Sequence, residues 1–207
     1  MSRIALKGTL ALLLLTAAGA ARADAYLESR YRLTNLVGVT WEASIPVGTL
    51  RDFVDQPTYR GGQLEVRTGV TRHLSLGLAS SWDWITQNFT KKTTQFGDAL
   101  VTAPTYDRLQ LITLRGTLDW YLTDTMVQPY LGAGVGGVWA SAIRAVGPTS
   151  RSHSEFTLVA EPHLGALITI APGIAVLANA RYQYTLANAF EAKNIRTVVL
   201  GVGLAVY

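Results

Sequence analysis

The chain has 207 residues, only 15% of them charged, and its mean hydropathy is slightly positive at +0.22. It contains no Cys, which excludes a disulfide framework, a thiolate metal site, a Cys nucleophile and a lipid-modified N-terminal Cys. The formal charge of +4 falls to +1 if Arg3, Lys7 and Arg22 leave with an N-terminal leader, because the 18 Lys and Arg become 15 against 14 Asp and Glu. Charge therefore implies no acidic partner such as a nucleic acid.

The N-terminus has the form of a secretory leader. Arg3 and Lys7 precede an apolar run over residues 9–18, and Ala21-Arg22-Ala23 has the small-x-small form of a signal-peptidase site. The run is too short for an anchoring helix, which needs about 20 residues. We predict a signal peptide over residues 1–23, cleaved after Ala23, and one mature domain over residues 24–207.

Residues 108–122 identify the class of the mature domain. From Ile112 to Leu122 every second residue is apolar or glycine, and the residues between are polar or charged. Successive side chains of a strand point to opposite faces, so this segment is a strand with one apolar and one polar face. About 10 such residues are enough for one strand of a membrane-spanning β-barrel.

The same pattern recurs along the chain. Strands are predicted at about 36–47, 62–70, 74–85, 106–122, 127–140, 155–170, 174–184 and 195–207. Tight turns at 71–73, 123–126 and 171–173 alternate with long polar loops at 48–61, 86–105, 141–154 and 185–194. An even number of strands lets the first pair with the last, so that no edge is left open to lipid. The predicted fold is all-β, an eight-stranded antiparallel up-and-down transmembrane barrel.

Aromatic residues stand near the predicted strand ends, where the two aromatic girdles of a membrane barrel lie. Trp41 falls in mid-strand and is not assigned to a girdle. The residues that we assign are Trp82, Trp84, Trp120, Trp139, Tyr182 and Tyr184.

If the apolar face meets lipid, charged residues of both signs face inward. A soluble lipocalin-like barrel would show the reverse arrangement. We predict that Glu42, Glu65 and Glu161 pair with Arg67, Arg115 and Arg181 across the interior and close it to water; the alternative is a wet interior without specific pairs. The predicted network is Glu42, Glu65, Arg67, Arg115, Asp119, Glu161 and Arg181, and Asp83 and His163 share the same face.

Three glycines of the fifth strand, at 132, 134 and 136, recur with the period of a strand. They point to one face and either make room for larger side chains opposite or permit strong coiling. No helix is predicted to follow, so this is not a phosphate-binding loop.

These segments resemble the small outer-membrane β-barrel proteins of Gram-negative bacteria, the OmpA/OmpX-type and OmpW-like eight-stranded barrels. The resemblance rests on residues 129–137 after the turn 122–127, on the turn and strand start at 70–77, and on a last strand ending at Tyr207, and it covers residues 26–207. It implies an outer-membrane location, contacts with membrane lipids and lipopolysaccharide, and a monomer. It also implies recognition by the barrel-assembly machinery through the last strand.

The last strand departs from the assembly signal of such proteins, which has aromatic residues facing lipid on alternate terminal positions. Here the bulkier face carries Val198, Leu200, Val202, Leu204 and Val206. Tyr207 is the predicted assembly signal, and either it faces inward or the small-residue face is the outer one.

Catalysis is not predicted. Ser152, His153 and Ser154 are suitable types for a nucleophile and its base, but neighbouring residues of a strand point apart. The pattern of lipid-A deacylase barrels, a His and a Ser two apart followed by Asn, is not reproduced. His153, Glu155 and His163 do not have a recognised metal-ligand spacing, and no cofactor is predicted.

The sequence favours a non-catalytic barrel with a structural, envelope or surface-interaction role. The alternatives are a narrow porin-like channel for small or apolar molecules and, less favoured, a lipid-A-modifying enzyme. A soluble periplasmic binder would leave the apolar stripes of Ile112, Leu114, Leu118 and Leu164 exposed to water.

Overall fold

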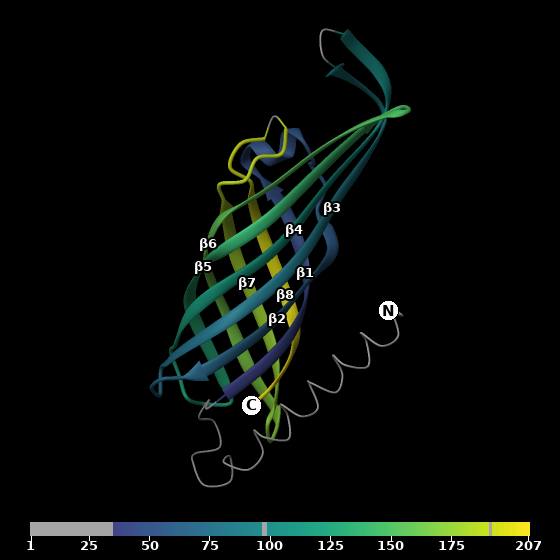
Figure 1. The fold of residues 1–207 in the computed structure, drawn as a ribbon. Coiled ribbons are helices and arrows are strands. Elements are labelled where there is room, and N and C mark those ends of the chain that lie inside the picture. Colours follow the sequence, from purple (N-terminus) through teal and green to yellow (C-terminus); the bar gives the residue numbers. More distant parts are fainter. Residues whose placement is uncertain (1–34, 97–98, 191) are drawn as a thin grey trace, which may run out of the picture.

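A computed structural model of the chain describes residues 35–96, 99–190 and 192–207. The predicted signal peptide lies outside these residues. Eight strands follow one another around a closed barrel, each pairing antiparallel with its neighbours in sequence, and the last pairs with the first (Figure 1). The predicted eight-stranded antiparallel barrel is therefore confirmed.

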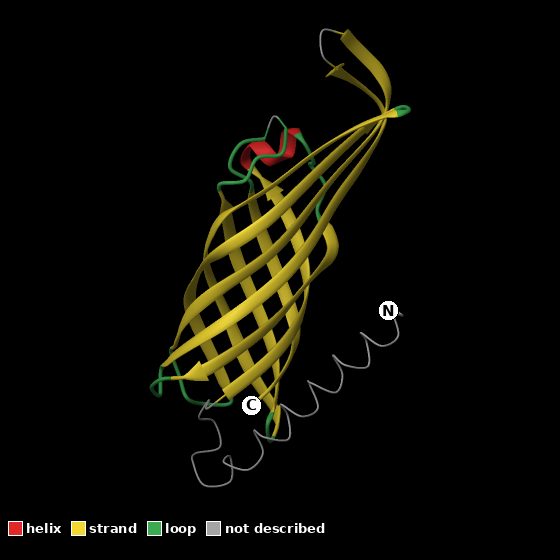
Figure 2. Ribbon diagram, viewed as in Figure 1, coloured by secondary structure: helices red, strands yellow, loops and turns green. Residues whose placement is uncertain are grey.

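The described residues form almost nothing but strands (Figure 2). In the described part of the chain, no helix has the length and apolar character needed to cross a membrane. The elements are β1 (Asn35–Val47), the short 3-10 helix η1 (Gly48–Asp52), β2 (Thr58–Gly69), β3 (Leu74–Phe96), β4 (Ala99–Tyr121), β5 (Val127–Val146), β6 (Thr149–Ala171), β7 (Ile174–Thr185) and β8 (Arg196–Val206).

Burial alternates along the strands, as the sequence pattern predicts. On β4, Leu114 is 63% exposed on the outer surface, whereas its neighbours Thr113 and Arg115 are buried inside. The same parity runs through β8, where Leu200, Val202 and Leu204 face outward. The outer surface of the barrel is thus an apolar band, whereas the middle of the interior is largely polar.

Two of the four segments predicted as loops are instead continuations of strands, so this part of the prediction is wrong. Residues 86–96 and 99–105 continue β3 and β4 as one hairpin, and residues 141–146 and 149–154 continue β5 and β6 as another. Their composition, rich in Thr, Asp, Asn, Gly, Pro and Lys, is typical of solvated loops, but Thr has a high strand propensity, and strands beyond the membrane need no apolar face. We call residues 86–96, 99–105, 141–146 and 149–154 the protruding sheet; it extends away from the barrel mouth (Figure 2).

The other two predicted loops lie at the same end of the barrel. Residues 48–57 contain η1 and follow β1 directly, and β2 begins at Thr58, earlier than predicted. The segment between β7 and β8 has a narrow bend at Ala189 and Ala192, whose backbone groups bond each other. We call the end of the barrel that carries these segments and the protruding sheet the hairpin end. The opposite end, with the tight turns and the C-terminus, is the short-turn end (Figure 1).

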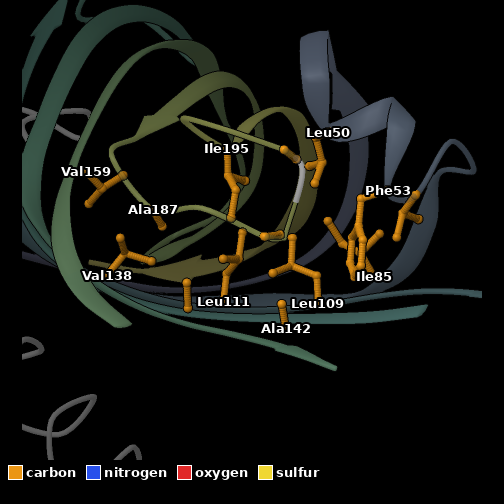
Figure 3. Packing of buried hydrophobic residues seen from close by; sticks show 14 residues of the cluster. Leu50, Phe53, Ile85, Leu109, Leu111, Val138, Ala142, Val159, Ala187 and Ile195 are labelled. Carbon is orange, nitrogen blue, oxygen red and sulfur yellow. The ribbon is translucent and has the colours of Figure 1, made fainter. Parts of the chain in front are cut away.

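Two apolar clusters fill the two ends of the interior. At the hairpin end, inward residues of the wall meet residues of the segments above the mouth (Figure 3); the members include Leu50, Phe53, Ile85, Leu109, Leu111, Val138 and Ile195. At the short-turn end the cluster is Leu36, Tyr121, Tyr130, Leu167, Ala175, Leu177 and Ala205, with Tyr207 packed against it. The residues of the predicted charge network lie between these two clusters.

Candidate functional site in the barrel interior

All seven residues of the predicted charge network are inside the barrel and buried. They come from five strands, because each has the inward parity of its own strand: Glu42 on β1, Glu65 and Arg67 on β2, Arg115 and Asp119 on β4, Glu161 on β6 and Arg181 on β7. Burying this many charges is costly unless each is paired and hydrogen-bonded.

Each of the three glutamates pairs with an arginine in the structure. Arg181 binds both carboxylate oxygens of Glu42, with Nη2 2.6 Å from Oε2. Arg115 on β4 pairs with Glu161 on β6. Arg67 lies 3.0 Å from Glu65, but these two residues are on the same strand, so this pair does not cross the interior as predicted.

Gln63 joins the three pairs. Its side-chain oxygen accepts hydrogen bonds from Arg115 and, at 2.7 Å, from Arg181. Its amide nitrogen donates to Glu65 at 2.5 Å. Gln63 was missed in the sequence because it is uncharged, although it has the same parity on β2 as Glu65 and Arg67.

Arg67 connects the charges to the apolar cluster at the short-turn end. It donates to the hydroxyl groups of Tyr121 and Tyr130 at 3.0 and 3.1 Å, and its guanidinium carbon lies 4.4 Å from the Tyr130 ring centre. Asp119 lies 3.5 Å from Arg67 and 2.5 Å from His163 Nε2. The pairs thus form one network rather than separate contacts.

Asp83 is buried in the same interior. Its Oδ1 accepts a hydrogen bond from Ser44 at 2.5 Å, and its Oδ2 is buried with no hydrogen-bond partner among the described residues.

The glycines of β5 leave space for these side chains. A Cβ at Gly134 would lie 3.1 Å from Glu161 Cγ and 3.3 Å from Arg115 Cδ. At Gly132 it would collide with His163 and Asp119. These contacts agree with the first of the two interpretations given for the β5 glycines, that they make room for larger side chains.

Little free volume remains in the charged layer. A cavity of about 10 Å³ lies among Gln63, Glu65, Arg115 and Glu161, enough for about one water molecule. Apolar side chains close the interior above and below it. An interior of eight strands is just wide enough for side chains to fill it, and here they do.

The predicted girdle residues lie on the outer surface. Trp82, Trp84, Trp120, Trp139 and Tyr182 are each at least 38% exposed there, and Tyr184 is half-buried beneath Arg196. Phe156, which lies opposite Trp139 on the outer face and is 76% exposed, was not in the predicted set.

Tyr207 has the inward parity of β8. Its hydroxyl lies 2.6 Å from Thr169 Oγ1, and its ring packs on the cluster at the short-turn end. Of the two readings of the last strand, the bulky Val and Leu face is therefore the outer one.

One buried ion pair was missed entirely. Arg144 on β5 binds Asp107 on β4 through Nε at 2.9 Å and Nη2 at 3.1 Å. Both residues continue the inward parity of strands β4 and β5, but the predicted fifth strand ended at residue 140.

The polar residues considered for catalysis do not assemble into a triad. His153 Nε2 is 3.6 Å from Glu155, and Ser154 donates to Ser141 at 2.9 Å, all on the protruding sheet or at its base. Within residues 35–96, 99–190 and 192–207, no group of three or more His, Cys, Asp or Glu is placed to hold a metal ion.

Sequence comparison decides the family. The family described as "Outer membrane protein beta-barrel domain" matches residues 10–207. The chain belongs to this family. It is thus an outer-membrane β-barrel protein of the Gram-negative type, and its band of outward Leu, Val and Trp side chains is the surface that meets lipid.

Solved structures show the same fold at low identity. Neisserial surface protein A is 17% identical, with a TM-score of 0.54 over 83% of this chain and 96% of that one. A major outer membrane protein of Thermus thermophilus is 13% identical, with a TM-score of 0.50 over 82% and 98%. No match to the sequence was found among the curated proteins.

Proposed function

We propose that the protein is a non-catalytic barrel that acts at the cell surface through its protruding sheet, with the sealed barrel as its anchor. One observation carries this proposal: four strands continue together beyond the barrel. Pairing of β2 with β3 ends at Gly61 and Asp83, whereas pairing of β3 with β4 continues to Phe96 and Ala99.

The strand edges of the protruding sheet also support the proposal. Pairing of β6 with β7 ends at Val159 and Thr185, whereas β5 and β6 continue to Val146 and Thr149. Unpaired strand edges are sites at which other chains add a strand. The filled interior supports a role of the barrel as an anchor rather than as a channel.

The test separates surface interaction from an envelope role. Cells would display the full chain or a variant in which residues 89–105 are replaced by a two-residue turn, and adhesion to an epithelial layer and resistance to detergent would be measured. We expect the shortened hairpin to abolish adhesion and leave detergent resistance intact. Unchanged adhesion of the shortened variant would contradict the proposal. Cells that lack the barrel altogether are the third sample. If only these cells lose their resistance to detergent, the barrel itself has an envelope role.

Membrane partners fit the outer surface near the hairpin end. Arg108 lies 4.9 Å from the Trp84 ring centre and Arg196 5.3 Å from the Tyr184 ring centre. Aromatic residues at a membrane interface with cations beside them suit the phosphates of lipopolysaccharide. A monomer, export with cleavage after Ala23, and recognition of the last strand by the assembly machinery belong to the same proposal.

A second candidate function, passage of small apolar molecules through the barrel wall, rests on a groove at Pro162. Pairing of β6 with β7 skips Pro162, which has no N–H to donate, and resumes in the same register at His163 and Arg181. A hollow of about 480 Å³ opens there on the lipid-facing side, lined by Leu131, Leu164, Tyr182 and Val198 among others. Uptake of an apolar dye by cells should fall in Pro162→Ala if this candidate is right, and equal uptake would reject it.

A further inference from the structure

The mouth of the barrel at the hairpin end is closed by residues 48–57, which we call the lid, together with the segment between β7 and β8, which contributes Ala187, Ala189, Ala192 and Ile195. Leu50, Phe53 and Val54 point from it into the interior and are fully buried. Figure 3 shows Leu50 and Phe53 of the lid in the same cluster as Ile85 and Leu109 of the wall. The lid therefore fills an apolar well with its own side chains.

Within the part of the chain that the structure describes, the lid makes few hydrogen bonds to other segments. Its internal turn is closed by the amides of Phe53 and Val54 bonding to Leu50. Among the described residues, its side-chain hydrogen bonds to the surroundings are those of Asp55 N to Gln87 at 2.6 Å, of Thr49 to the carbonyl of Lys193 at 2.8 Å, and of Arg51 to the carbonyl of Pro46 at 3.2 Å. Anchoring thus depends mainly on its apolar side chains.

Arg144 fixes one of these anchors. Its guanidinium carbon lies 5.0 Å from the ring centre of Phe53 and 5.2 Å from that of Phe190, and the two rings are 5.6 Å apart. A planar guanidinium held by two parallel bonds presents flat faces to aromatic rings. Asp107 supplies those two bonds and is itself buried.

The position of this pair relates the lid to the protruding sheet. Asp107 and Arg144 are directly opposite each other on β4 and β5, at the base of the protruding sheet. A shift of β4 against β5 at this level separates the carboxylate from the guanidinium. Phe53 then loses the surface on which it rests.

We propose that the Asp107–Arg144 pair is a latch that keeps the lid closed, so that the state of the protruding sheet determines access to the outer part of the interior. This goes beyond the proposed surface role and does not depend on it. The charged layer lies deeper and remains closed when the lid opens.

The absence of Cys from the chain allows a direct test by thiol labelling. Ala142→Cys places a single small thiol on the inward face, at a position that is 1% exposed and two residues before Arg144. Its modification by a membrane-impermeant maleimide would be followed on the refolded full-length mature protein. We expect slow modification with the latch intact and a rate at least about tenfold higher with Arg144→Gln or Asp107→Asn added, because breaking a buried pair shifts local opening.

Two controls make the result specific. Arg108→Gln removes the neighbouring outward arginine and should leave labelling of Ala142→Cys unchanged. Ser150→Cys, on the exposed part of β6, should be labelled at the same rate in every background. Arg144→Lys keeps the charge without the two parallel bonds and should give an intermediate labelling rate. This variant also serves as the test if Arg144→Gln does not fold.

Three results would overturn the latch. These are rapid labelling of Ala142→Cys with the latch intact, no acceleration in a folded latch variant, and equal acceleration by Arg108→Gln. None of them bears on adhesion through the protruding sheet, so the two proposals fail independently.

Discussion

Inside the barrel, each buried charge is stabilised by a side chain of opposite charge. Arg115→Ala would leave Glu161 with the more distant Arg181, at 3.4 Å, as its arginine neighbour. We expect a loss of about 3–5 kcal/mol in the free energy of unfolding, measured by urea titration of the refolded protein in lipid vesicles. Arg60→Ala, on the exposed surface of β2, is the matched control and should change little. An unchanged midpoint for Arg115→Ala would show that the pair does not stabilise the barrel.

The glycine stripe of β5 gives a second residue-scale prediction. Gly134→Val adds bulk against Glu161 and Arg115 and should destabilise by about 1–3 kcal/mol in the same titration. At Gly116, on the outer face of β4, the nearest atoms to a new Cβ are 4.0 Å away, so Gly116→Ala is the control and should be tolerated. Equal effects of the two substitutions would contradict the tight interior packing.

The charged partners were predictable from the sequence because strand parity puts residues of one face together. Parity does not show which partners meet, so the Glu65–Arg67 pair within one strand was not foreseen. Neutral members such as Gln63 and Tyr130 carry no charge signal, and their hydrogen bonds appear only with the register between strands.

Among the elements, the strand cores and tight turns were predictable, but the strand lengths were not. The alternation of apolar and polar residues marks only the part of a strand that meets lipid. β3 continues to Phe96 and β5 to Val146, although both were expected to end near the membrane surface. Outside the membrane neither face has to be apolar, so the pattern that identifies strands disappears there.

The two parts of each long hairpin should differ in stability. Amides of β3 and β4 near Thr93 and Thr102 are paired only within the protruding sheet, whereas those near Leu78 and Gly116 lie in the closed barrel. We expect hydrogen exchange of the first group to be at least about 100-fold faster than that of the second. Uniform protection along both hairpins would contradict a sheet that stands apart from the barrel.

On the scale of the whole molecule, the interior is filled from end to end. An apolar cluster with two tyrosines closes the short-turn end, the ion-pair network fills the middle, and the lid with the wall closes the hairpin end. Closure of β1 on β8 leaves no edge within the membrane. This filled interior supports the proposal that the barrel anchors the protruding sheet.

Single-channel recording of the refolded mature protein in a planar bilayer tests this sealed interior most directly. The account predicts a folded barrel that shows no discrete conductance, because side chains leave room for only about one water among the charges. Arg144→Gln should stay equally silent, since the charged layer lies below the lid. Discrete, reproducible openings of the unmodified protein would contradict the sealed barrel and identify a channel lined by the charged residues.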